Sequence, residues 1–235
     1  MTRHDPKIVI ALDYAQPQEA INFITQLDPS LCRLKVGKEL FTAGGPQLVE
    51  ALIKQEFDVF LDLKFHDIPT TVSKACEAAS RLGVWMLNVH ASGGQAMMEA
   101  AREGVSRSGR NPILIAVTVL TSMNQATLNS LGVAGTVEDH VLRLAKLTKA
   151  SGLDGVVCSA QEAKLLRDNF GQDFCLVTPG IRPADASLDD QSRVVTPHQA
   201  LELGSSYLVI GRPITQSKSP LETLQKIHQE ISLTF

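Results

Sequence analysis

The chain lacks the features of a membrane-spanning or secreted protein. Its longest apolar runs, such as Ile113–Val117, are far shorter than the roughly 20 residues that a membrane helix needs. The early run Ile8–Leu12 is too short for the core of a signal peptide. Positive charge is not in excess, because 22 Lys and Arg stand against 25 Asp and Glu, a formal net charge of -3. We therefore expect a cytoplasmic protein that binds neither nucleic acid nor membranes.

Cysteine and histidine are few, and their spacing does not suit a metal site. The 4 cysteines are widely scattered with no C-x-x-C pair, and most lie in apolar segments, where a reduced thiol packs as a small hydrophobic group. The 6 histidines show neither H-x-x-x-H nor H-E-x-x-H spacing. We expect structural thiols and no bound metal.

Short runs rich in β-forming residues alternate with longer segments of helical periodicity along the whole chain. The predicted strands are Ile8–Tyr14, Cys32–Gly37, Asp58–Phe65, Trp85–His90, Ile113–Leu120, Gly155–Ser159, Cys175–Gly180 and Tyr207–Ile214.

Proline and glycine support the helices expected between these strands. Apolar residues repeat at three- and four-residue steps in Val72–Leu82 and Val137–Thr148. Residues suited to first helical turns and to helix ends fall at the expected places: Pro17, Pro46, Pro69, Pro197 and Pro220, then Gly83, Gly152 and Gly204. Consecutive strand-helix units without a linker predict an α/β protein, a single-domain (β/α)8 TIM barrel over residues 1–235. An open doubly wound sheet is the alternative.

Polar residues gather where the predicted strands end. In a barrel of this kind the chemistry lies at the carboxyl-terminal ends of the strands. The residues in question are Asp13, Lys35, Asp62, Lys64, Thr121, Ser122, Thr178, Arg182, Gly211 and Arg212.

The third predicted strand carries the clearest signal of function. Asp62 and Lys64 are two residues apart in an otherwise apolar strand, so regular alternation points both into the barrel. Burying two charges costs several kcal/mol unless they are paired, which favours a functional site over a structural one. Lys35 and Asp67 would extend the pair into an alternating array. A lysine held between carboxylates stays protonated and is a suitable proton donor to a carbanion.

A second signal lies late in the chain. Motifs follow the seventh and eighth predicted strands: the segment Thr178–Pro183, then Gln191, then Gly211–Pro213. Barrel enzymes often bind phosphate through these loops, where glycine amides and an arginine fork match a dianion. We expect a phosphate ester as substrate, although Gly-Arg-Pro by itself is as often only a turn.

These motifs carry a family resemblance. The run Asp62–Val72 is similar to the D-x-K-x-x-D-I-P-x-T signature of orotidine 5'-phosphate decarboxylases in their bacterial form. The similarity extends over essentially the whole chain, through Ala11–Asp13, Lys35–Gly37, Thr178–Pro183 and Val209–Ile214. It implies removal of CO2 from orotidine 5'-monophosphate (OMP) to give uridine 5'-monophosphate (UMP), the last step of pyrimidine nucleotide synthesis, without a metal or organic cofactor.

The resemblance also implies a role for each site residue. Lys64 would give a proton to C6 of the pyrimidine, Asp62 would lie beside the departing carboxylate, and Lys35 would hold the array. The remaining substrate contacts would come from Asp13 and Lys35 to the ribose, Thr121 and Ser122 to the pyrimidine edge, and Arg182, Gln191, Gly211 and Arg212 to the phosphate.

A homodimer follows from the same resemblance, because Asp67, Ile68 and Thr71 would reach into the neighbouring subunit's site. The polar segment 184–192, rich in Asp and Ser, is typical of a mobile loop that phosphate binding would close. Three alternatives remain: a Mg2+-dependent barrel enzyme acting on keto-sugar phosphates, a non-catalytic nucleotide-binding barrel, and a structural subunit.

Overall fold

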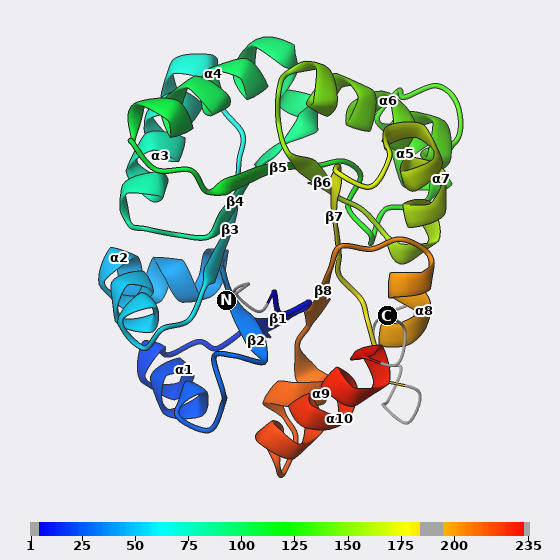
Figure 1. Ribbon diagram of the computed structural model, residues 1–235. Coiled ribbons are helices and arrows are strands. Elements are labelled where there is room, and N and C mark those ends of the chain that lie inside the picture. Colours follow the sequence, from blue (N-terminus) through cyan, green and yellow to red (C-terminus); the bar gives the residue numbers. More distant parts are fainter. Residues whose placement is uncertain (1–4, 184–194, 233–235) are drawn as a thin grey trace.

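A computed structural model describes residues 5–183 and 195–232 of the chain. Its strands pair in parallel and in chain order from β1 to β8, and β8 pairs with β1 to close a barrel. Helices surround the ring of strands (Figure 1). The predicted (β/α)8 barrel is confirmed, and the open sheet is excluded.

The strands are short, from three to seven residues. Their bounds are β1 Ile8–Leu12, β2 Cys32–Gly37, β3 Val59–Phe65, β4 Met86–His90, β5 Ile113–Val117, β6 Gly155–Val157, β7 Cys175–Thr178 and β8 Tyr207–Ile210.

A helical segment follows every strand. These segments are α1 Pro17–Ile24, α2 Lys38–Lys54, α3 Pro69–Arg81, the 3-10 turn η1 Ala91–Gly93, α4 Gln95–Arg107, α5 Gln125–Ser130, α6 Val137–Ala150, α7 Ala160–Phe170, α8 Pro197–Glu202, α9 Arg212–Thr215 and α10 Pro220–Ser232.

Most of the predicted strands extend too far at their carboxyl ends. The fifth was expected to reach Leu120 but ends at Val117, and the eighth was expected to reach Ile214 but ends at Ile210. The apolar residues beyond these ends belong to other structures, since α9 begins at Arg212 and Leu120 lines a cavity. Hydrophobic character alone therefore does not mark where the barrel ladder stops.

Proline and glycine mark the helix boundaries almost as the sequence predicts. Pro17 and Pro69 occupy the first positions of α1 and α3, where the missing N–H leaves no helical hydrogen bond unmade. Pro46 differs, because it lies inside α2. Gly45, with φ 61°, interrupts the helical path just before it, so Pro46 begins the second part of that helix.

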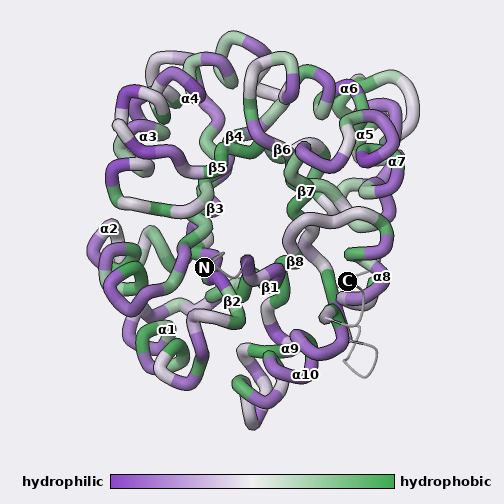
Figure 2. The backbone as a smooth tube through the Cα atoms, viewed as in Figure 1, coloured by the Kyte–Doolittle hydropathy of each residue, from purple (hydrophilic) through white to green (hydrophobic). Residues whose placement is uncertain are grey.

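The apolar residues form two layers separated by the strands. The outer cluster packs the strands against the helices, and along the tube of Figure 2 the barrel strands are mostly hydrophobic while the helices alternate. The inner cluster fills the barrel itself and consists of Val9, Ala11, Phe60, Met86, Ile115, Val177 and Val209. Several of its members also line the cavity described below, so this cluster forms the cavity floor. Within residues 5–183 and 195–232, no helix is long and apolar enough to cross a membrane.

Candidate active site

A cavity of about 290 Å³ lies at the carboxyl-terminal ends of the strands. Ala11, Phe60, Val177 and Val209 give it an apolar floor. The polar residues around it are mainly those that the sequence singles out: Asp13, Lys35, Asp62, Lys64, Thr121, Arg182, Gly211 and Arg212. Residues from distant parts of the chain thus meet in one place, as parallel strands in a barrel require.

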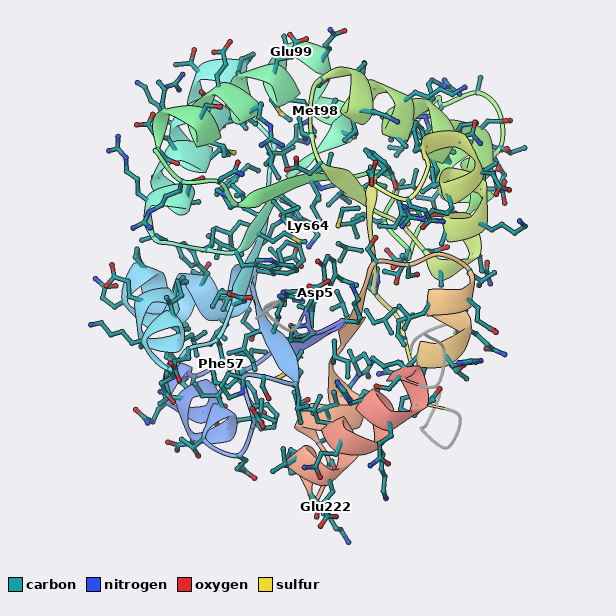
Figure 3. The ribbon with its side chains drawn as sticks, viewed as in Figure 1. Asp5, Phe57, Lys64, Met98, Glu99 and Glu222 are labelled. Carbon is teal, nitrogen blue, oxygen red and sulfur yellow. The ribbon has the colours of Figure 1, made fainter. Side chains whose placement is uncertain are left out.

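Four charged side chains form a continuous array in this cavity. The Lys64 Nζ lies 2.6 Å from Asp62 Oδ1, and the Lys35 Nζ lies 3.4 Å from Asp62 Oδ2 and 3.4 Å from Asp13 Oδ1. The Asp62 and Lys35 side chains are only 12% and 11% exposed, whereas Lys64 is 25% exposed. Figure 3 shows Lys64 reaching over the centre of the barrel. The order of charges is Asp13, Lys35, Asp62, Lys64, and the Lys64 ammonium is the more exposed of the two cations.

The central carboxylate is held in its ionised form. Burial by itself raises the pKa of Asp62, but the charges of Lys35 and Lys64 outweigh it and leave the pKa below the ordinary value of 3.8. Hydrogen bonds from Lys64 and Asn88 act in the same direction. At neutral pH the cavity therefore contains a fixed negative charge beside two cations.

The backbone of Lys64 does not have the regular strand conformation that alternation along β3 assumes. Its φ of 53° lies in the left-handed region, which non-glycine residues seldom adopt. The β3–β4 pairing is irregular here, because Leu61 pairs with Leu87 and Phe65 with Val89. Three residues of β3 therefore lie opposite Asn88 alone. The expectation that Asp62 and Lys64 face the interior is correct, but regular alternation is not the reason.

Asn88 is the buried polar residue of this site that the sequence interpretation missed. It is 0% exposed, its Nδ2 donates to Asp62 Oδ1 at 2.7 Å, and its Oδ1 accepts from the Lys64 backbone N–H at 2.8 Å. The signal was present, since Asn88 is the one polar residue among Met86–Val89. A neutral amide attracts less attention than a charge in such a run.

Local sequence also makes room for Lys35. A Cβ added at Gly37 would lie 3.3 Å from the Lys35 Nζ, so a side chain there would press on the ammonium. A smaller cavity of about 160 Å³ adjoins on the side of α2. It shares the four charged residues Asp13, Lys35, Asp62 and Lys64 with the main cavity. The array is therefore reached from two sides.

The late motifs supply the opposite wall of the main cavity. Arg182 is 5% exposed, its backbone N–H donates to Val195 O at 3.1 Å, and its side chain lines the cavity together with Gly211 and Arg212. Thr178 does not line it, because its hydroxyl is buried against Ser205 Oγ at 3.0 Å. Two arginines and the backbone of the β8–α9 turn therefore face the same space as the lysine–aspartate array.

Other residues singled out in the sequence are not brought into the cavity. Asp67, Ile68, Thr71 and Ser122 are exposed and line neither cavity of the described residues. Asp67 Oδ1 accepts from the Ile68 backbone N–H at 2.6 Å, and Ile68 is 67% exposed. The expected extension of the array to Asp67 is thus absent within a single described chain. Gln191 and the segment 184–192 lie outside the described residues.

The four cysteines form no disulfide, and three of them are buried. Burial raises the pKa of Cys32 and Cys76 to about 12. No group of three or more His, Cys, Asp or Glu side chains within residues 5–183 and 195–232 is placed to hold a metal ion.

The closed barrel and the charged cavity together define the class, a (β/α)8 barrel enzyme. The model of the orotidine 5'-phosphate decarboxylase / HUMPS family matches residues 6–227. The chain belongs to this family, which confirms the resemblance seen in its motifs.

Two curated relatives and one solved structure show how similar this chain is to individual members of the family. The orotidine 5'-phosphate decarboxylase of Hydrogenovibrio crunogenus is 61% identical over 227 residues, 97% of this chain and 96% of that protein. The enzyme of the same name from Pseudoalteromonas atlantica is 58% identical over 229 residues, 97% and 99% of the two chains. The crystal structure of the Lactobacillus acidophilus orotidine 5'-phosphate decarboxylase superposes with a TM-score of 0.87 at 40% identity, covering 97% and 99%. At this similarity the chain is a carboxy-lyase.

Proposed function

We propose that this carboxy-lyase removes CO2 from OMP to give UMP in the cytoplasmic synthesis of pyrimidine nucleotides, as one (β/α)8 domain per chain and without a cofactor. The observation that carries the proposal is the Lys64 ammonium, held 2.6 Å from Asp62 in a cavity that two arginines also line. The names of its curated relatives supply the substrate.

Fixed charge is the means of catalysis in this proposal. The bond between C6 and the carboxylate breaks so that the electron pair stays on C6, CO2 leaves, and the Lys64 Nζ gives its proton to C6. No carbonyl is placed to delocalise the electron pair, so the cation must stabilise it. Asp62, ionised and immobile, holds the ammonium in place. Repulsion between Asp62 and the substrate carboxylate is a secondary contribution.

The rest of the substrate fits around this centre. Asp13 and Lys35, joined at 3.4 Å, would hold the ribose hydroxyls, and Thr121 with Ser122 would meet the pyrimidine edge. Arg182, Gly211 and Arg212, with Gln191, would bind the phosphate. A guanidinium and backbone amides suit a phosphate dianion. Binding energy from this remote group would assist the chemical step, with segment 184–192 as the part that closes over it.

A homodimer completes the array in this proposal. Asp67 takes no ion-pair partner within the described part of its own chain, and Ile68 beside it is 67% exposed. Both follow β3 at the rim, just before Pro69 opens α3. Asp67, Ile68 and Thr71 of one subunit would therefore enter the partner's site, consistent with the second opening beside Lys35 and Lys64.

A single assay tests the function. Purified protein, treated with EDTA, is mixed with OMP and the absorbance of the orotate ring is followed. We expect complete conversion to UMP. Activity only after Mg2+ is restored, with turnover of a pentulose phosphate instead, would identify a keto-sugar phosphate enzyme. Binding of UMP with no turnover of OMP would identify a non-catalytic nucleotide-binding barrel.

A further inference from the structure

We propose that Asn88 is a positioning residue for the catalytic pair, one that holds both the backbone of Lys64 and the carboxylate of Asp62 and so sets the direction of the Lys64 ammonium. This inference rests on the proposed function, because it concerns the same reaction. Asn88 does not line the cavity. It acts through Asp62 and Lys64, the two residues of β3 to which it is hydrogen bonded.

The irregular pairing explains why such a residue is needed. Between Leu61 and Phe65, three residues of β3 lie outside the regular pairing, and Asn88 is the single residue of β4 opposite them. Backbone groups in this excursion lose their regular partners, and Lys64 has in addition a left-handed φ of 53°. The Asn88 side chain replaces the missing ladder bond by accepting from the Lys64 N–H at 2.8 Å. A conformation of this kind persists only where its surroundings fix it.

The second hydrogen bond links the backbone to the charge. The Asn88 Nδ2 donates to Asp62 Oδ1 at 2.7 Å, the same oxygen that receives the Lys64 ammonium at 2.6 Å. One side chain therefore holds both the backbone and, through the carboxylate, the ammonium of Lys64. The amide of Asn88 can do this because it carries a donor and an acceptor at its two ends. A fully buried amide that left either group unpaired would instead be destabilising.

Asn88→Asp is the variant that tests this, because it keeps the shape of the side chain and makes its donor depend on pH. When the new carboxyl group is protonated, it donates to Asp62 and accepts from the Lys64 N–H as the amide does. When it ionises, it repels Asp62 and the donor is lost. Two carboxyl groups this close share a proton well above the ordinary range for one of them.

Other titrating groups face the same region. Asp62 and Lys64 come from β3, Lys35 from β2, and His90 from β4 itself, with His66 in contact with it at 5.4 Å between ring centroids. The strand β5, Ile113–Val117, carries no titratable side chain. Burial, followed by His66 and the nearby lysines, lowers the pKa of His90 below 6.5. These groups are shared by the wild type, so the ratio of variant to wild-type kcat at each pH isolates the substitution.

We expect Asn88→Asp to have about 100-fold lower kcat than the wild type at pH 8. The kcat ratio should rise by up to about tenfold per pH unit as the pH falls towards 5. The Kd of UMP should stay within about threefold, because the ribose and phosphate contacts are elsewhere. The control is Asn169→Asp on α7, whose exposed amide donates to Leu165 O and lies far from the charged array. Its ratio should stay near one at every pH.

A kcat ratio for Asn88→Asp that does not change with pH would overturn the assignment, whatever its size, and so would a parallel loss of UMP affinity. If the variant does not fold, hydrogen exchange in the wild type decides. The Nδ2 protons of Asn88 should exchange far more slowly than those of Asn169, and equal rates would contradict the hydrogen bond to Asp62. An inactive wild type would instead refute the proposed function, which keeps the two failures apart.

Discussion

Both ends of the barrel interior contain buried charges, but the two ends differ in how these charges are compensated. At the amino-terminal end, Arg33 is 5% exposed, and its guanidinium pairs with Asp5 Oδ1 at 2.8 Å and Asp58 Oδ2 at 3.2 Å. It also donates to the Pro6 carbonyl and lies 4.1 Å from the centroid of the Trp85 ring. The described part of the chain thus supplies two carboxylates, a carbonyl and an aromatic ring to this cation.

At the carboxyl-terminal end, the array is completed only in part. The Lys64 ammonium has Asp62 on one side and a cavity of about 290 Å³ on the other. Since a buried charge is costly unless it is compensated, a cation facing open space marks where a ligand of opposite charge belongs. Arg33 and Lys35 lie two residues apart on β2 but face opposite ends of the barrel, and in the proposed function only Lys35 contacts the substrate.

The largest expected effect comes from the Lys64 end of the array. Lys64→Ala should lower kcat by about 10⁴-fold or more, because it removes the proposed proton donor together with its positive charge. Binding of UMP should remain, since the proposed function assigns the phosphate and ribose contacts to other residues. Steady-state assays with OMP measure kcat, and titration calorimetry with UMP measures the Kd of the product. Near-normal turnover would remove Lys64 from the role of acid.

Arg212→Ala tests the other wall of the cavity. The KM for the phosphorylated substrate should rise by about 100-fold, while turnover of the unphosphorylated nucleoside should change little. The melting temperature should stay close to that of the wild type, in contrast with a change at the amino-terminal end. Equal losses on the two substrates would place Arg212 outside the phosphate site.

Arg33→Met makes the reverse test at the amino-terminal end. It keeps the length of the side chain but leaves Asp5 and Asp58 without their shared cation, and we expect a loss of about 2 to 3 kcal/mol in the free energy of unfolding. The KM and kcat of the folded protein should stay within about twofold. Lys164→Met is the matched control, because its exposed pair with Asp168 on α7 should contribute less than about 0.5 kcal/mol. Urea unfolding measures the free energy of unfolding of both variants. A fall in kcat for Arg33→Met without loss of stability would erase the distinction between the two ends.

The sequence predicts these features to different depths. The barrel and the Asp62–Lys64 pair were predictable because eight apolar strands alternate with helices and because charges inside an apolar strand are costly. The irregular pairing of β3 was not, since no pattern of residue types distinguishes a regular strand from one with residues out of the ladder. Asn88 stands out in the sequence as a polar residue in an apolar strand, but its contacts with Asp62 and Lys64 depend on the register of β3 and β4.

The position of Asp67 shows a different limit. Its place in the motif suggested a member of the array, but in one described chain it hydrogen bonds only to the neighbouring Ile68 N–H at 2.6 Å. Spacing along the chain cannot tell whether a rim residue serves its own barrel or another. The amino-terminal end of the barrel is complete within one chain, whereas the proposed dimer would complete the carboxyl-terminal end from outside.

The last prediction separates these two possibilities. Lys64→Ala and Asp67→Ala proteins should each be inactive, and a co-refolded equal mixture should recover about a quarter of wild-type activity. Half of the dimers are then mixed, and one of the two sites in each receives Lys64 from one chain and Asp67 from the other. The second site of the same dimer lacks both. If Asp67 served its own chain, every site in the mixture would lack one of the two residues. Absence of recovery, with mixed dimers observed by native mass spectrometry, would therefore show that each carboxyl-terminal end is complete within its own chain, as the amino-terminal end is.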